Sequence, residues 1–146
     1  MLINLLLGFF TISVCLLLQS MLLMAALRYY RGHDRDINNP SYLASLIVIN
    51  GVLLLLVLGN LGQVAVWALL FQWLGEFERF ADAYYHSAVN FATLGYGDVV
   101  MSPAHRLLGA IEAINGVLMI GISTAVLMSV FQDAMRRTIE ARGQGV

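Results

Sequence analysis

Six consecutive residues have types and spacing suited to binding a cation through backbone oxygens: Thr93, Leu94, Gly95, Tyr96, Gly97 and Asp98. Gly95 and Gly97 alternate with bulkier residues, and glycine adopts a positive φ without steric cost. Successive carbonyl groups can therefore turn toward one axis and present a ladder of oxygens. From this spacing we predict that the stretch forms an ion filter.

The filter stretch lies between two apolar segments that are long enough to cross a bilayer. Residues 1–27 and 37–75 carry no charge, and residues 107–132 carry only Glu112. Each run exceeds the roughly 20 residues that cross a hydrocarbon core about 30 Å thick. With 60% hydrophobic residues and a mean hydropathy of +0.78, the chain is predicted to be an all-α membrane protein. At membrane depth, non-helical backbone must be buried in protein or line a wet pathway.

The six residues resemble the signature of the tetrameric potassium channels, usually written TVGYGD, with Leu94 in place of the valine. In that family, four loops surround the ion and their carbonyl oxygens replace its hydration shell. The resemblance covers residues 42–132. It implies two membrane helices with a re-entrant pore helix and filter between them, in a small channel of the bacterial kind. Because Leu94 would contribute through its backbone, the oxygen ladder is expected to be kept.

The chain is predicted to divide into parts that follow the apolar runs. There are four: an additional N-terminal transmembrane helix (1–27), a cytoplasmic loop (28–41), the pore domain (42–132) and a short cytoplasmic tail (133–146). The pore domain would contain an outer helix (42–70), the pore helix (82–92), the filter (93–98) and the inner helix (107–132). The pore helix, with Asp82 as its N-cap, is too short to span. The negative end of its dipole would point at the pore centre and favour a cation.

The distribution of arginines predicts the orientation in the membrane. Six of the eight arginines lie in segments 28–41 and 133–146, which are therefore assigned to the inside, while Arg79 and Arg106 are assigned to the outside. Three spanning helices with an internal C-terminus place the N-terminus outside. We expect a multi-pass protein of the plasma or inner membrane with its filter toward the external side.

The resemblance also implies the ion ligands. K+ would be held by the Thr93 hydroxyl and by the carbonyl oxygens of Thr93, Leu94, Gly95 and Tyr96. Gly97 and Asp98 would complete the filter. One chain supplies a quarter of each ring of oxygens, so the resemblance implies a homotetramer.

Two residues of the predicted pore helix, Tyr85 and His86, stand where many relatives carry aromatic side chains that brace the filter. By resemblance, Tyr85 pairs with Asp98 and His86 approaches Tyr96. Histidine titrates near neutral pH. Two interpretations of His86 are therefore open, a pH-sensitive filter and a neutral bracing ring.

Glu112 is the one acidic residue in a predicted membrane helix, and such a residue is costly to bury without a partner. By helix rise it lies at the depth of the pore helix, where Asn90 or Ser87 could hydrogen-bond to it. Bracing the filter from behind and facing the ion cavity are both open. Gly116 stands where relatives carry a glycine on which the inner helix bends, so a hinge and close packing are the two interpretations of this position.

These features predict a potassium-selective channel that conducts K+ passively. A non-selective cation channel, and a non-conducting membrane subunit or assembly protein, are the alternatives. We expect no enzyme, because no carboxylate pair, Cys/His pair or metal-spaced cluster appears outside the filter region. We expect K+ ions in the filter but no organic cofactor and no nucleic acid. The partners would be further copies of the chain, membrane lipid and, as an open question, an accessory subunit.

Overall fold

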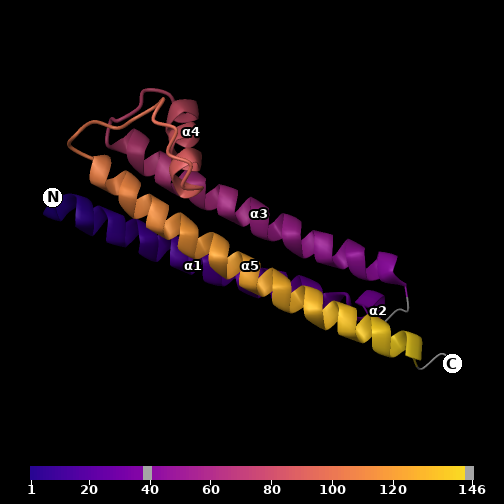
Figure 1. Cartoon of the computed structure of the whole chain (residues 1–146). Coiled ribbons are helices and arrows are strands. Elements are labelled where there is room, and N and C mark those ends of the chain that lie inside the picture. Colours follow the sequence, from indigo (N-terminus) through magenta and orange to yellow (C-terminus); the bar gives the residue numbers. More distant parts are fainter. Residues whose placement is uncertain (38–40, 144–146) are drawn as a thin grey trace. The chain divides into compact units, whose positions relative to one another are not determined.

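The computed structural model describes residues 1–37 and 41–143, and these form helices without any strand. The helices are α1 (Leu2–Gly32), α2 (Asp34–Ile37), α3 (Tyr42–Trp73), α4 (Phe80–Phe91) and α5 (Arg106–Gly143) (Figure 1). Among them, α1, α3 and α5 are long and apolar enough to cross a membrane, and the short α4 lies between the second and third of these. The predicted all-α fold with three spans and a short helix before the last is confirmed.

The long helices extend beyond their predicted bounds. Helix α1 continues to Gly32 and is followed by α2, so most of the predicted loop 28–41 is helical, and α3 ends at Trp73 instead of residue 70. Helix α5 continues to Gly143, through the predicted tail 133–146. An apolar run marks only the part of a helix that crosses hydrocarbon. Arginine has a high helix propensity, so a helix can extend beyond the apolar run into water. Residues 38–40 of the predicted loop and 144–146 of the predicted tail lie outside the described residues.

Helix α4 begins earlier than predicted, and Asp82 is not its N-cap. The N-cap position belongs to Arg79, whose backbone is extended (φ −104°, ψ 134°) and whose side chain makes no capping hydrogen bond. Asp82 lies in the first turn, where its carboxylate is 3.4 Å from the Arg79 guanidinium. A negative side chain there still faces the positive end of the helix dipole. Asp82 therefore favours this helix end through its charge.

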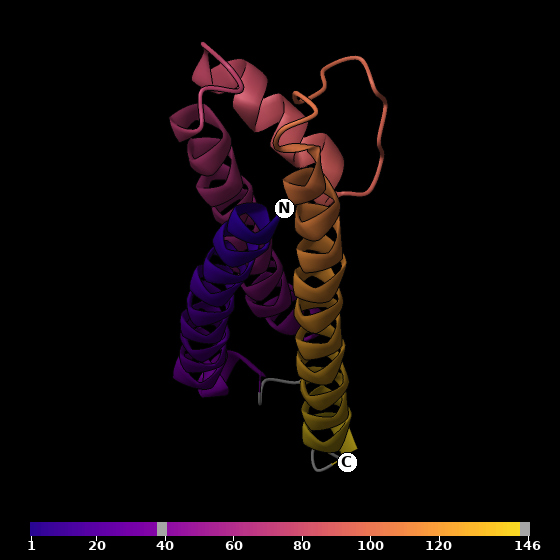
Figure 2. The ribbon, with the colours of Figure 1, turned by 90° about the vertical axis from the view of Figure 1, so that its left-hand side faces the viewer.

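The chain folds into two compact units, and α1, α3 and α5 each contribute to both. The first unit contains Met1–Gln19 and Gly59–Gly121, and the second contains Ser20–Leu58 and the chain from Ile122 onward. The first unit includes α4 and the loop that leaves its C-terminal end and returns to the start of α5 (Figure 2). Its buried core consists of Cys15, Val64, Trp67, Phe71, Phe91, Met101, Leu108 and Met119.

Small and polar residues hold α1 in each unit. In the first unit, a methyl group on Gly8 would lie 2.8 Å from Cδ1 of Ile111, so α1 and α5 approach closely there. Gln63 Nε2 of α3 donates to Gln19 Oε1 of α1 at 2.7 Å. In the second unit, Gly51 of α3 packs against the ring of Tyr29. Helix α1 is thus an integral part of both cores.

Candidate ion filter

The filter stretch begins where α4 ends, and two backbone hydrogen bonds fix this junction. The Thr93 N–H donates to the Asn90 carbonyl at 2.8 Å, and the Leu94 N–H donates to the Val89 carbonyl at 2.9 Å. Together with a φ of 57° at Thr93, they form a Schellman motif, whose left-handed position is usually glycine. A threonine in this conformation stores strain on the order of 1–3 kcal/mol, of a kind that clusters at functional sites.

The sign of φ alternates along the stretch. Thr93, Gly95 and Gly97 have positive φ values of 57°, 58° and 75°, while Leu94 and Tyr96 between them do not. When left-handed and right-handed residues alternate, successive N–H groups converge on one side and the carbonyl oxygens converge on the other. The backbone can therefore present a row of oxygens to a cation, as the glycine spacing suggests.

The filter is open on one side in a single protomer. The side chains of Leu94 and Tyr96 are 54% and 65% exposed, although both are large and apolar or aromatic. Beside them lies a pocket of about 480 Å³ whose walls include Thr93, Gly95 and Arg106. A single chain can surround an ion from one side only.

The C-terminal end of the filter stretch is attached to α4 through Asp98. Tyr85 Oη donates to Asp98 Oδ2 at 2.7 Å, and the Val99 N–H donates to Asp98 Oδ1 at 3.0 Å. The bond from Tyr85 lowers the pKa of Asp98, and the same bond raises the pKa of Tyr85. Tyr85 and Asp98 thus form the pair that the resemblance implies.

His86 attaches α4 to the segment that leaves the filter, and its partners differ from the expected Tyr96. Its Nδ1 lies 2.8 Å from the Val99 carbonyl oxygen, and its Nε2 lies 2.9 Å from Asn90 Nδ2. The amide donates to Nε2, so the proton resides on Nδ1 and is donated to Val99. This assignment describes a neutral ring that links two backbone segments.

Glu112 lies fully buried behind α4 and is hydrogen-bonded to Ser87. Ser87 Oγ also donates to the Val64 carbonyl at 2.9 Å. A hydroxyl has one proton, and a carbonyl can only accept. The contact between Ser87 and Glu112 is therefore satisfied when Glu112 is a neutral acid that donates to Ser87. Of the two roles left open for Glu112, this position favours bracing α4 from behind.

Gly116 lies where α5 touches the backbone at the end of α4. A methyl group on Gly116 would overlap the Phe91 carbonyl oxygen and would lie 2.7 Å from the Phe91 carbonyl carbon. A methyl group on Gly109 would lie 2.9 Å from Asn90 Nδ2. Close packing against α4 is therefore the interpretation of Gly116 that the contacts favour over a hinge.

Four residues that hold the loop between the filter stretch and α5 were not among the predicted site residues. Glu76 accepts hydrogen bonds from the N–H and the Oγ of Ser102, both at 2.6 Å, and His105 Nδ1 lies 2.5 Å from its Oε1. Asn4 Nδ2 of α1 donates to the Ala104 carbonyl at 2.6 Å. Burial opposes ionisation of Glu76, but the hydrogen bonds from Ser102 and His105 outweigh it and lower the pKa. No local sequence pattern connects these residues.

Comparisons with known proteins place this site in a family. The profile of a family described as "Ion channel" matches residues 61–133, which is half of the chain. Potassium voltage-gated channel subfamily A member 2 of Oncorhynchus mykiss is 34% identical over 70 residues, which cover 47% of this chain and 14% of that protein. No solved structure gives a significant match.

The matched segment contains the end of α3, the whole of α4, the filter stretch and most of α5. The resemblance found from the filter residues is therefore confirmed at the level of the family, and it concerns a channel and not an enzyme. The chain is a multi-pass membrane protein that belongs to the pore-loop ion channel family.

Proposed function

We propose that the chain is one subunit of a potassium-selective channel that conducts K+ passively. The observation that carries the proposal is the alternation of φ at Thr93, Gly95 and Gly97 directly after α4. The ligands of K+ would be the Thr93 hydroxyl and the carbonyl oxygens of residues 93–96. Oxygens held in this way replace the hydration shell, so the ion can enter without a large free-energy barrier.

A closed ring of four copies would complete the site. One protomer leaves the filter and the side chains of Leu94 and Tyr96 exposed, and rotation about an axis would bury them against neighbouring copies. Pore-loop channels typically assemble as tetramers, which agrees with this requirement. Four α4 helices would then direct the negative ends of their dipoles toward the ion.

The orientation in the membrane is also part of the proposal. Arginines concentrate near the ends of α1 and α5, which favours a cytoplasmic location for the loop 28–41 and for the C-terminal segment 133–146. The N-terminus and the filter would face the outside. Residues 42–132 would form the pore domain, with α1 as an additional helix packed on it.

Hydrogen bonds that attach the filter stretch to α4 at both of its ends support the proposal. Tyr85 and His86 hold its outer end, while the Schellman motif holds its inner end at Thr93. Glu112 and Asn90 support α4 and His86 from behind. Conduction also requires that each ion leave readily, so several sites of moderate affinity in a row are favourable.

Flux from liposomes tests the proposal. Purified protein would be reconstituted with an outward gradient of either K+ or Na+, and ion release would be followed with a membrane-potential or pH dye. We expect K+ flux and little Na+ flux. Gly95→Ala should abolish K+ flux, because φ is 58° at Gly95 and alanine is strained there, although nothing lies within 4 Å of the added methyl group.

Gly62→Ala is the matched control, because a methyl group on this α3 glycine also meets nothing within 4 Å and no positive φ is involved. It should conduct as the wild type does. Equal K+ and Na+ fluxes would instead support the non-selective cation channel. An intact wild-type assembly without any flux would support the non-conducting subunit.

A further inference from the structure

Five buried side-chain atoms of the first unit have no hydrogen-bond partner among the residues that the structure describes. Four of them are Trp67 Nε1 of α3, Glu112 Oε2 of α5 and the amide atoms Nδ2 and Oδ1 of Asn115 of α5. The fifth is Gln63 Oε1, whose side chain is already bonded to Gln19 through Nε2. These side chains are at most 1% exposed, so each unpartnered atom has given up its bonds to bulk water. Such a cluster requires an explanation.

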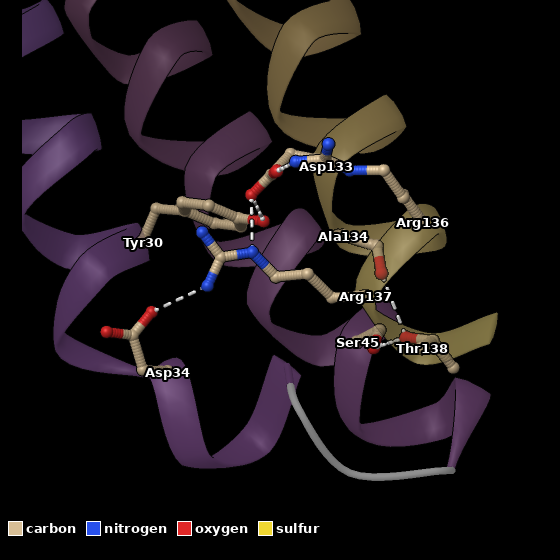
Figure 3. A network of polar contacts seen from close by, with 8 residues as sticks. All are labelled: Tyr30, Asp34, Ser45, Asp133, Ala134, Arg136, Arg137 and Thr138. Atoms are coloured by element: carbon tan, nitrogen blue, oxygen red, sulfur yellow. Dashed lines mark hydrogen bonds and ion pairs between the residues drawn. The ribbon is translucent and has the colours of Figure 1, made fainter. Parts of the chain in front are cut away.

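Buried polar side chains of the second unit have partners, by contrast (Figure 3). Tyr30 Oη donates to Asp133 Oδ2 at 2.9 Å, and Ser45 Oγ lies 2.6 Å from Thr138 Oγ1. Thr138 Oγ1 donates in turn to the Ala134 carbonyl at 2.9 Å. All five unpartnered atoms belong to the first unit, so the shortage of partners is a property of one place and not of the whole chain.

Three of the residues with unpartnered atoms surround Cys15 of α1. The Cys15 side chain is completely buried, and its thiol lies beside Asn115 and Trp67 and close to Glu112. Glu112 and Asn115 are three residues apart in α5 and therefore share one face of that helix. Polar atoms of α3 and α5 thus meet next to α1, within the first unit.

The donors and acceptors at this place match those that one water molecule needs. Because neutral Glu112 donates from Oε1 to Ser87, its Oε2 is the carbonyl oxygen and can only accept. Asn115 Oδ1 also accepts, whereas the indole N–H of Trp67 can only donate. A water molecule that accepts from Trp67 and donates to Glu112 and Asn115 makes about three hydrogen bonds, the typical number for a buried water. Asn115 Nδ2 is left with the sulfur of Cys15, a weak acceptor, beside it.

We propose that the first unit binds one ordered water molecule between Trp67, Glu112 and Asn115. The small side chain of Cys15 leaves more room at this junction than a leucine would. A cation fits the site less well than water, because Trp67 presents a donor and Glu112 is a neutral acid. The water links α3 to α5 and extends the support of α4, which Ser87 and Glu112 begin, as far as Trp67.

Transfer of magnetisation from water to the indole proton of Trp67, observed by NMR, tests the proposal. Protein labelled with nitrogen-15 tryptophan gives two indole signals, and Trp73→Phe assigns them. Trp67 is completely buried, so in a dry interior its indole proton has no water proton near it. We expect a cross-peak between water and the Trp67 indole proton. In a rotating-frame experiment the sign of the cross-peak distinguishes dipolar transfer from proton exchange.

Asn115→Leu tests whether the cross-peak comes from this site. Leucine removes one acceptor of the water and replaces it with an apolar group, so the cross-peak should disappear. Met119→Leu is the matched control, because Met119 is also completely buried and lies one turn further along the same face of α5. Leucine removes no polar atom there and conserves the volume, so the cross-peak should remain.

A second pair of variants changes the room for the water and keeps its three partners. Cys15→Leu should displace the water and abolish the cross-peak, whereas Cys15→Ala should retain it. A wild-type protein without the cross-peak would overturn the proposal. A cross-peak that persists in Asn115→Leu and Cys15→Leu, or that disappears in Met119→Leu as well, would show that it does not report on this site. Ion flux plays no part in the measurement, so the result is independent of the proposed function.

Discussion

Replacement of Gly116 by alanine tests whether this glycine is a hinge or a site of close packing against α4. The two interpretations predict changes of opposite sign in the free energy of unfolding. The added methyl group would lie 2.7 Å from the carbonyl carbon and 2.8 Å from the Cα of Phe91. These are backbone atoms, which cannot rotate away, so α5 and α4 must separate. We expect Gly116→Ala to destabilise the protein. If Gly116 were only a hinge, alanine would stabilise the helix by about 1 kcal/mol.

Gly121 allows the steric contribution to be isolated. It lies in the same helix, and a methyl group there meets no atom within 4 Å. Both variants gain the same helix propensity, so the difference between them is the steric cost alone. Overpacking costs about 1–3 kcal/mol, and contact with backbone atoms favours the upper end. The expected difference corresponds to a change of about 5-fold to 150-fold in the unfolding equilibrium.

The assay compares the wild type and both variants in one detergent. Melting temperature would be measured from the loss of circular dichroism, and ion flux would be measured afterwards in liposomes. Gly116→Ala should melt below the wild type, and Gly121→Ala should melt at or above it. Gly116→Ala should also lose discrimination between K+ and Na+, because α4 leads into the filter. Equal melting temperatures of the two variants would refute the packing argument.

Three further predictions concern residues around the filter. Tyr85→Phe removes the bond that lowers the pKa of Asp98, so this pKa should rise in an NMR titration of the Asp98 carboxyl carbon; an unshifted titration would contradict the pairing. Hydrogen bonds from Ser102 and His105 lower the pKa of Glu76 in the folded protein below its ordinary value of 4.5. The ionised Glu76 carboxylate should therefore stabilise the fold fully above about pH 4.5, and this stabilisation should disappear as the pH falls through the folded-state pKa. The melting temperatures of wild type and Glu76→Gln should therefore converge in acid, and a gap that is constant with pH would argue against this role. Glu112→Gln should keep melting temperature and K+ flux near wild type because a neutral donor suffices. Glu112→Leu should lose stability, because the buried Ser87 oxygen then accepts no hydrogen bond and keeps only its own donation to the Val64 carbonyl; equal losses in both variants would show that the charge is needed.

Several features could be predicted from the sequence because they depend on short segments. Runs with no more than one charged residue located three spanning helices, since the cost of a charge in hydrocarbon applies to each helix by itself. The spacing of Gly95 and Gly97 predicted a backbone that turns its carbonyls to one side, because positive φ is a local property of glycine. The positive φ of Thr93 was not predictable in this way, since it results from the Schellman motif at the end of α4.

The sequence by itself determined the class of the protein, the place of the filter and the number of membrane spans. Only the tertiary structure decided which partners hold the filter in place. Glu76 with Ser102 and Asn4 with Ala104 are pairs that lie far apart in the chain. Helix rise had left Asn90 and Ser87 as partners for Glu112, and the structure shows the hydrogen bond to Ser87. Each of these contacts depends on the distance between two packed helices or loops, and no periodicity within one helix specifies that distance.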